Sequence, residues 1–331
     1  MTGQDSGHAP PSGFSWGDYL DALVAHHGTL TALAWRLVQA GDFADDVGSV
    51  ERGLRRLRGR GQRDGGEWGR RLLRLCGVPR PVAARTQWMG VYHSRFTDLP
   101  VPLCLDQLRL WDRPPVSESW ARIWICLGLA NVALRSGEPD EAARALGQAR
   151  GLAAHAPVAA QLELWLVEAF LASNQDDRAT VAERLAQVGA RLTAPELDAE
   201  DAACFRARWL DQQAWQVNHP PDGGAPDPAR ARALYEQLPD AGLPPFAGCR
   251  RENGLAYACW KLGLTDEALG HAEAACRYAG DGGYLRLRAM SLLLRARIVG
   301  GAAGAPIRER ARAIAGQLED RALIARIDRK T

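Results

Sequence analysis

Apolar residues recur at the spacing of an α-helix through most of the chain. From about residue 119 onward the pattern predicts helices in pairs, each roughly 14 to 18 residues long. Ahead of them it predicts three shorter amphipathic helices, which begin near Asp18, after a Thr29 N-cap, and within residues 45–61. We therefore expect an all-α protein.

The predicted helices divide the chain into four parts. We expect a disordered tail at residues 1–14, a small basic domain at 15–78, a structured bridge at 79–118 and a helical repeat domain at 119–331. The bridge is dense in Trp, Tyr, Phe, Arg and Pro. Because a flexible linker is poor in aromatic residues, we expect this segment to pack in an ordered form.

One pattern of small and apolar residues occurs three times in the repeat domain. Its first copy consists of Leu129, Ala130, Ala133, Gly137, Ala142, Leu146 and Ala149. Its second copy consists of Leu166, Val167, Phe170, Asn174, Ala179, Glu183 and Ala186. Its third copy consists of Leu255, Ala256, Cys259, Gly263, Ala268, Ala272 and Ala275. Small residues let the paired helices approach closely, and the Gly or Asn ends the first helix in a left-handed turn.

This pattern resembles the tetratricopeptide repeat (TPR) family over residues 119–320. The family's aromatic residue, the Gly after its Leu and its closing Pro are largely missing, and Glu183 replaces a large apolar residue. The spacing from Gly137 to Asn174 is 37 residues, compared with 34 in the family. Weaker predicted pairs lie at 196–217 with 227–238 and at 284–299 with 306–318, and a capping helix at 320–329.

The resemblance implies a TPR-like α-solenoid, a right-handed superhelix whose concave groove binds a peptide or a protein segment. In that family the first helix of each pair lines the groove. The groove residues expected on this basis are Asn131, Arg135, Glu168, Arg208, Gln212, Asn253, Tyr257, Arg286 and Arg288. Solvated surface positions are the alternative for each of them. Core positions are expected for Trp120, Trp124, Trp165, Trp209, Trp215 and Trp260.

The third N-terminal helix has one apolar side and one basic side. Its apolar side is formed by Val47, Val50, Leu54 and Leu57, and its arginines lie opposite. Three short helices ending in a basic one, followed by the glycine-rich residues 59–71, resemble a winged helix-turn-helix domain. That resemblance implies that the third helix enters the DNA major groove and that a hairpin wing touches the backbone. The expected DNA-binding residues are Arg52, Arg55, Arg56, Arg58, Arg60 and Arg63.

Charge is divided unevenly along the chain. Residues 49–85 hold eleven arginines and three acidic residues, a local balance of +8, whereas the whole chain has a formal charge of +2, so the rest sums to −6. A basic block on an acidic body indicates an anionic partner for that block. Two alternatives stay open: the arginines form a solvated face of an extra helical hairpin, or they meet an RNA or an acidic protein.

Composition indicates a cytoplasmic protein without cofactor or metal. No apolar run reaches the roughly 18 residues of a membrane-spanning helix, and the N-terminus lacks the features of a signal peptide. The seven cysteines form no CxxC pair and are expected to be reduced and mostly buried. His26 and His27 are adjacent on a predicted helix, so they point to different sides and are not expected to share a metal.

A catalytic role is not expected. In the bridge, His93, Ser94 and Asp98 lie within six residues, but catalytic triads normally converge from separate parts of a fold. We expect Arg95 and Asp98 to bond the backbone of the bridge instead. The sequence contains neither a phosphate-binding glycine loop nor a nucleophile elbow.

Together these features are similar to peptide-responsive transcriptional regulators that combine a helix-turn-helix domain with TPR repeats. We expect a DNA-binding regulator whose groove senses a peptide or a protein, and the resemblance adds a possible homodimer. The alternative is a TPR adaptor or scaffold that mediates protein–protein interaction without binding nucleic acid.

Overall fold

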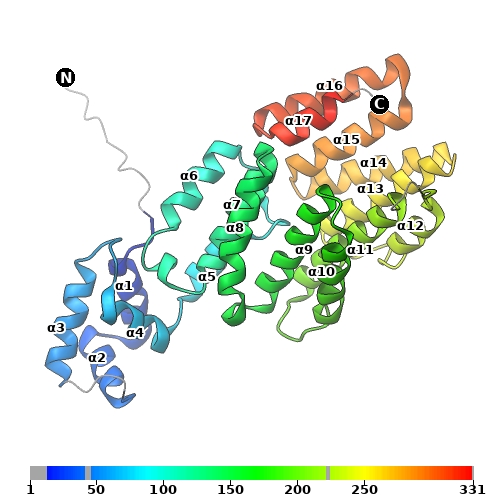
Figure 1. Ribbon diagram of the computed structural model, residues 1–331. Coiled ribbons are helices and arrows are strands. Elements are labelled where there is room, and N and C mark those ends of the chain that lie inside the picture. The colour runs from blue at the N-terminus through cyan, green and yellow to red at the C-terminus, as the bar shows by residue number, and fades with distance from the viewer. Residues whose placement is uncertain (1–12, 42–45, 221–223, 330–331) are drawn as a thin grey trace, which may run out of the picture.

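The computed structural model describes residues 13–41, 46–220 and 224–329 of the chain. Within these ranges all regular secondary structure is helical, which confirms the predicted all-α class. Figure 1 shows a small N-terminal group of helices set apart from a long curved array, with α5 and α6 between the two.

Four short helices form the N-terminal domain: α1 (Trp16–His27), α2 (Leu30–Gln39), α3 (Val47–Arg58) and α4 (Gly66–Cys76). Side chains cap three of them, because exposed amides at a helix start need acceptors. Ser15 caps α1, Thr29 caps α2 as predicted, and Asp46 caps α3. Their apolar faces share one core, whose fully buried members include Trp16, Tyr19, Leu20, Leu33, Leu54, Leu57 and Leu72.

The predicted hairpin wing at residues 59–71 is wrong. This segment is a turn that continues into α4. Its glycines make room for an aromatic ring: a Cβ at Gly65 or Gly69 would lie 2.3 or 2.7 Å from the indole of Trp16. The same indole donates a hydrogen bond to the carbonyl of Arg63 at 3.0 Å. The glycines therefore serve close packing, which a sequence pattern does not distinguish from a hairpin.

The segment after this domain is ordered and largely helical. It contains α5 (Arg80–Gly90), the 3-10 helix η1 (Arg95–Asp98), α6 (Val101–Trp111) and the 3-10 helix η2 (Val116–Glu118). Its buried apolar side chains belong to a core that also includes Ile125 and Val132 of the next helix. The bridge is thus built into the body of the protein.

Part of the predicted N-terminal tail is packed. Residues 1–12 lie outside the described residues, but Phe14 stacks on Trp111 with 6.1 Å between ring centroids. The amide of Gly65 also donates to the carboxylate of Glu118 at 3.0 Å. These two contacts join the N-terminal domain to the last residue of α6 and the last residue of η2.

Five helix pairs form the repeat array, and a single helix follows them. The pairs are α7 (Arg122–Ser136) with α8 (Pro139–Leu152), α9 (Val158–Asn174) with α10 (Arg178–Arg191), α11 (Ala199–Asn218) with α12 (Pro228–Tyr235), α13 (Pro245–Lys261) with α14 (Thr265–Asp281), and α15 (Leu285–Val299) with α16 (Gly301–Gln317). The 3-10 helix η3 (Ala153–His155) extends α8, and α17 (Arg321–Asp328) is last. All five predicted pairs and the capping helix are present as helices, while membership of the TPR family stays a prediction.

The first and third copies of the repeat pattern pack as predicted. Their second-helix alanines, such as Ala142 and Ala268, are fully buried. Gly137 and Gly263 both have φ 79°, the left-handed turn expected after the first helix.

The second copy was placed in the wrong register on α10. Ala179, Glu183 and Ala186 were expected to pack inward, but all three are exposed. The buried residues of this helix are Val181, Leu185 and Val188, which are larger. Phe170 on α9 is also 47% exposed instead of buried. The left-handed residue between α9 and α10 is Asp176, with φ 59°, two positions after Asn174, and the buried residues of α10 are shifted by the same two positions.

The last helix of the array returns to the first. α17 contacts α7, as Figure 1 also shows. The guanidinium of Arg135 on α7 pairs with the carboxylate of Asp320, the residue before α17, at 3.2 Å. Arg286 on α15 pairs with the same carboxylate at 2.7 Å. One carboxylate therefore joins the first pair, the last pair and the cap.

Asp320 is completely buried, so its charge depends on these partners. Burial alone would raise the pKa of Asp320, but Arg286 and then Arg135, together with the hydrogen bond from the amide of Leu323, hold it below its ordinary value. Because the folded-state pKa is lowered, the stabilisation is present at neutral pH and is lost as the pH falls through that pKa.

Replacing Asp320 with Asn tests this closure. Asn can still cap α17, but it leaves Arg135 and Arg286 without a counter-charge in a buried site. We expect a loss of about 3 to 5 kcal/mol in the free energy of unfolding, measured in urea at pH 7. The difference between variant and wild type should shrink as the pH is lowered below about 4.

Asp328→Asn is the matched control. Asp328 pairs with Arg312 on the surface, where both side chains are about half exposed. An exposed pair contributes less than about 1 kcal/mol. Equal effects of the two substitutions would contradict a closing role for Asp320.

Candidate functional sites

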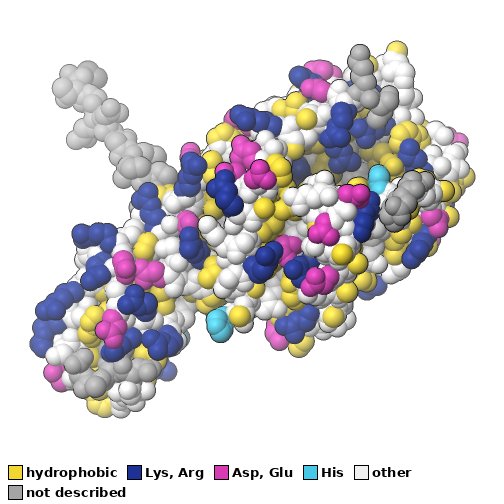
Figure 2. Space-filling model, in the orientation of Figure 1, with side chains coloured by type: hydrophobic (Ala, Val, Ile, Leu, Met, Phe, Trp, Pro, Cys, Tyr) yellow, Lys and Arg dark blue, Asp and Glu magenta, His cyan; other side chains and the backbone are white. Residues whose placement is uncertain are grey.

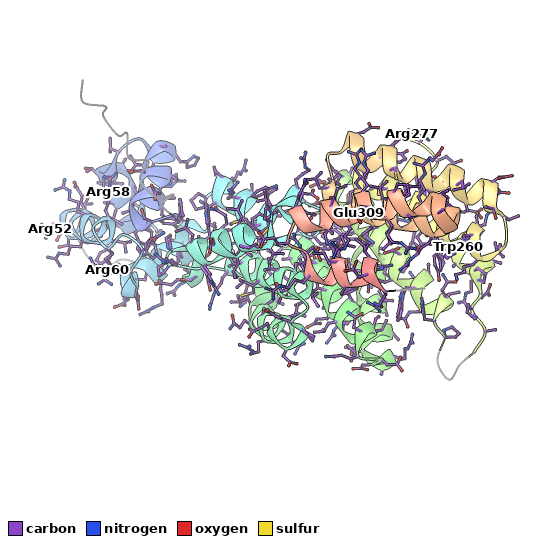
Figure 3. All side chains as sticks on the ribbon, turned by 90° about the horizontal axis from the view of Figure 1, so that it is seen from above. Arg52, Arg58, Arg60, Trp260, Arg277 and Glu309 are labelled. Atoms are coloured by element: carbon purple, nitrogen blue, oxygen red, sulfur yellow. The ribbon has the colours of Figure 1, made fainter. Side chains whose placement is uncertain are left out.

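The basic helix α3 is amphipathic in the predicted way. Val50, Leu54 and Leu57 are buried in the domain core, and the arginines on the other side are exposed. Figure 3 shows Arg52, Arg58 and Arg60 at the end of the molecule farthest from the repeat array. The apolar ridge therefore holds guanidinium groups outward.

The predicted DNA-binding arginines make only local contacts. Arg55 pairs with Glu51 on the same helix, Arg58 pairs with Asp21 on α1, and Arg52 donates to the hydroxyl of Ser49 at 2.9 Å. Arg60 and Arg63 donate to backbone carbonyls of the turn. For Arg56 there is no partner among the described residues. Carboxylates of the repeat array do not contact these six side chains within the described residues.

Packing on α4 fixes the orientation of α3. A Cβ at Gly53 would lie 2.6 Å from the ring of Trp68, so the ring covers this position of the helix. Gly59, by contrast, follows α3 with an ordinary helical φ of −72°, and its nearest Cβ contact would be 3.6 Å. Only the first glycine is required by its neighbours.

The bridge covers part of the inner face of the array. Tyr92, between α5 and η1, is surrounded by arginines from three helices: Arg208, Arg250 and Arg286 lie 4.9, 5.5 and 5.6 Å from its ring centroid. Arg250 also donates to its hydroxyl at 3.0 Å. Burial alone would raise the pKa of Tyr92, but the three guanidinium groups lower it. The bridge therefore occupies part of the surface that was expected to bind a ligand.

Most of the predicted groove residues contact other parts of the chain. Arg208 pairs with Glu163 inside the array at 2.9 Å. The other contacts are Asn131 to the carbonyl of Gly90, Arg135 and Arg286 to Asp320, Glu168 to Arg150 and Arg184, Gln212 to the carbonyl of Leu166, and Asn253 to Ser291. Arg288 lines a shallow hollow between α14 and α15, away from the inner face. Tyr257 and Arg288 are the two of the nine that are half-buried without such a hydrogen bond among the described residues.

The predicted tryptophan positions are mostly in the core. Trp124 is fully buried, and Trp215 is 37% exposed and stacks on His219. The remaining four, Trp120, Trp165, Trp209 and Trp260, are half-buried.

The bridge motif is not arranged as a triad. His93 pairs with Asp201 at 2.7 Å, Ser94 donates to the carbonyl of Trp88 at 2.6 Å, and Asp98 accepts from the amide of Arg286 at 2.9 Å. Asp98 thus bonds the backbone of α15 and not the predicted backbone of the bridge, and the guanidinium of Arg95 lies 3.9 Å from the same carboxylate. His93 and Asp98 therefore hold the bridge against α11 and α15, and Ser94 forms a bond within the bridge.

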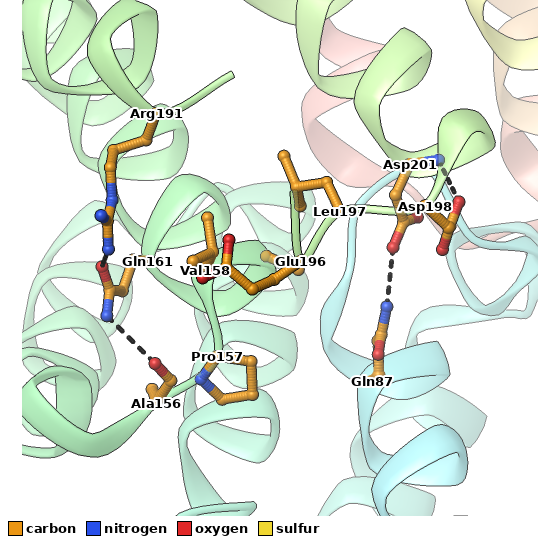
Figure 4. Close-up of a pocket in the computed structure, with 11 residues that line it drawn as sticks. Gln87, Ala156, Pro157, Val158, Gln161, Arg191, Glu196, Leu197, Asp198 and Asp201 are labelled. Carbon is orange, nitrogen blue, oxygen red and sulfur yellow. Dashed lines mark hydrogen bonds between the residues drawn. The ribbon is translucent and has the colours of Figure 1, made fainter. Parts of the chain in front are cut away.

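A polar hollow of about 420 Å³ lies where α5 meets the start of α9 and the segment before α11 (Figure 4). Its walls include Gln87, Gln161, Arg191 and Asp201. Gln87 donates to Asp201 at 2.9 Å, and Gln161 donates to the carbonyl of Ala156 at 3.0 Å. Because these groups are bonded to one another, the hollow presents few free donors or acceptors.

The cysteines and histidines give no sign of a metal centre. All seven cysteines are free thiols, and five are buried. Within the part of the chain that the structure describes, His, Cys, Asp and Glu do not gather in a group able to hold a metal ion. In the same residues, no helix combines the length and the apolar character needed to cross a membrane.

Comparison of the chain with protein-family models, with curated proteins and with solved structures gives no match.

Sequence patterns missed Tyr92, Asp320 and Arg326 as members of the inner face. Tyr92 lies in the bridge and Arg326 in the cap, two parts that were not expected to line a groove. The only available signal was the aromatic and arginine content of the bridge, which predicted order but not its location. Asp320 has the pattern of a simple helix cap, which is one of its two roles.

Two glycine substitutions test the support of α3. Gly53→Ala forces a methyl group against Trp68, and we expect a loss of about 1 to 3 kcal/mol in the stability of the N-terminal domain, measured by urea unfolding. Gly59→Ala should be neutral or slightly stabilising, because Ala favours helix and nothing obstructs it. If the two variants unfolded alike, Trp68 would not be constraining α3.

Proposed function

We propose that the protein is a DNA-binding transcriptional regulator whose repeat array senses an effector. One observation supports this most strongly: the guanidinium groups of α3 project from a buried apolar ridge, and no carboxylate in the described part of the array contacts them. A structural basic helix would be expected to pair with the acidic body of its own protein.

The chemistry of α3 suits a phosphate backbone. Arg presents a planar fork that binds phosphate oxygens or the edge of guanine in a bidentate manner. The acidic partners of these arginines, Glu51 and Asp21, are local and exposed or half-buried, so the pairs exchange readily with phosphate. Because the domain has no wing among the described residues, we expect Arg60 and Arg63 of the glycine-rich turn to contact the DNA phosphate backbone.

The connection between the two parts suits transmission of a signal. The N-terminal domain contacts the bridge through Phe14 and Gly65, and the bridge contacts the inner face of the array through Tyr92. A ligand that moves the inner face would therefore move the base of the DNA-binding domain. A homodimer, with two such domains presented together, remains part of the proposal because most operators have two-fold symmetry.

Fluorescence polarisation with labelled genomic DNA fragments tests the proposal. The affinity for DNA should fall steeply as salt is added. In a plot of the logarithm of the binding constant against the logarithm of the salt concentration, each phosphate contact should contribute about −0.9 to the slope. The triple substitution Arg52→Ala, Arg55→Ala and Arg56→Ala should abolish binding at moderate salt. Its helical content and melting temperature should be unchanged, because the three side chains are exposed.

The matched control removes three exposed arginines from the array: Arg206→Ala, Arg230→Ala and Arg277→Ala. It changes the net charge equally and should leave DNA binding within a few-fold of wild type. If wild type fails to bind DNA even at low salt, or if both triple variants weaken binding alike, the adaptor function without nucleic acid takes the place of this proposal.

A further inference from the structure

A second group of arginines surrounds a recess on the inner face of the array. Arg250 projects from α13, Arg286 and Arg297 from α15, and Arg326 from α17. Arg286 and Arg297 are eleven residues apart, so they share one face of α15. Figure 2 shows Lys and Arg side chains gathered in the recess below α16 and α17.

These guanidinium groups outnumber their carboxylate partners. Arg250 and Arg286 have carboxylate partners at 2.9 and 2.7 Å. Arg297 and Arg326 form no ion pair within residues 13–41, 46–220 and 224–329; the one hydrogen bond between them runs from the guanidinium of Arg297 to the backbone carbonyl of Arg326 at 3.4 Å. Two guanidinium groups in the recess therefore lack an ion pair among the described residues. The carboxylate of Asp211 is close enough to act on Arg326, but it already pairs with Arg250.

Arg326 is accessible to solvent and enclosed by the array at the same time. Desolvation lowers its pKa, and the neighbouring charges of Arg297, Arg286 and Arg250 lower it further. Desolvation also lowers the pKa of Arg297, with Arg308 as the next cause. A side chain on the wall of a concave surface can be exposed to solvent and still have its pKa lowered by the surrounding protein. Like charges held together there destabilise the fold unless an anion is present.

Arg250 adds a donor without an acceptor. Its side chain is only 12% exposed, and its Nε is buried without a hydrogen-bond partner in the described residues. Buried donors are normally satisfied, so an unsatisfied one beside unpaired charges indicates a missing acceptor. Tyr257, seven residues further along α13, contributes a half-buried aromatic ring near Arg297 and Arg326.

We propose that the recess bounded by Arg250, Arg297 and Arg326 binds a ligand with at least two oxyanion groups, carboxylate or phosphate. This inference rests on the effector-sensing part of the proposed function and names the chemistry of the effector. Guanidinium forks from three helices can bind such groups by charge-assisted hydrogen bonds. The ligand would join α13, α15 and the cap, next to the arginines that hold Tyr92.

Calorimetric titration tests the site without DNA. The protein used is the full chain with Arg52, Arg55 and Arg56 replaced by Ala, so that anions cannot bind α3. Inorganic tripolyphosphate is titrated in one experiment and a peptide of six glutamates in the other. The probe that binds more tightly shows whether the recess prefers phosphate or carboxylate groups. Adding Arg297→Gln and Arg326→Gln should weaken the tighter probe about tenfold or more, since each tenfold loss corresponds to about 1.4 kcal/mol.

The matched control adds Arg206→Gln and Arg230→Gln, two exposed arginines outside the recess, and should bind as tightly as the starting protein. Without a ligand, the recess variant should melt at the same temperature or higher, because it relieves repulsion between like charges. A lower melting temperature would assign the two arginines a structural role and overturn the proposal. Absence of binding by both probes, or equal binding by recess and control variants, would also overturn it.

The link to DNA is measured separately. In the chain with α3 intact, the tighter probe at low salt should change DNA affinity in wild type but not in the recess variant. Anion binding in a protein that does not bind DNA would leave the site standing while the regulator function fails.

Discussion

The fold depends on one buried carboxylate. Asp320 receives guanidinium groups from the first and the last helix pairs of the array while capping α17. Burying these ions costs several kcal/mol for each, and the cost is offset only when all three are in place. The array is therefore closed at this point, whereas a simple solenoid is held only by contacts between neighbouring repeats.

Closure explains why the inner face is different from an open peptide groove. The bridge runs along the inside, and Tyr92 lies among three arginines that would otherwise repel one another. Two sets of arginines differ in their partners. Arg135, Arg208 and Arg286 pair with buried carboxylates and hold the fold together. The arginines of α3 have local partners at most, Arg297 and Arg326 have no ion pair among the described residues, and we propose that the α3 arginines and this pair bind anions. The partner of each arginine therefore distinguishes a structural role from the proposed role in anion binding.

Local features of the sequence were sufficient to predict α1 to α3 and the paired helices of the array, but not α4, α5 and α6. The Thr29 cap, the Val50–Leu54–Leu57 ridge and the turn at Gly137 depend on residues a few positions apart, so periodicity reveals them. Contacts between distant residues were not predictable in this way: Arg135 and Asp320 are 185 residues apart. The missing wing has the same origin, because Gly65 and Gly69 pack against Trp16, which lies on another helix. The outward position of the α3 arginines was predicted. In the recess, Arg286 and Tyr257 were predicted as groove residues, whereas Arg250, Arg297 and Arg326 were not.

Amide hydrogen exchange tests the closure most directly. The last helix of an open array frays, so its amides exchange quickly and independently of the rest. If Asp320 closes the array, the amides of α17 should be protected to the same degree as those of α7, and both helices should lose protection together in rising urea. Rapid exchange in α17 while α7 stays protected would contradict the account.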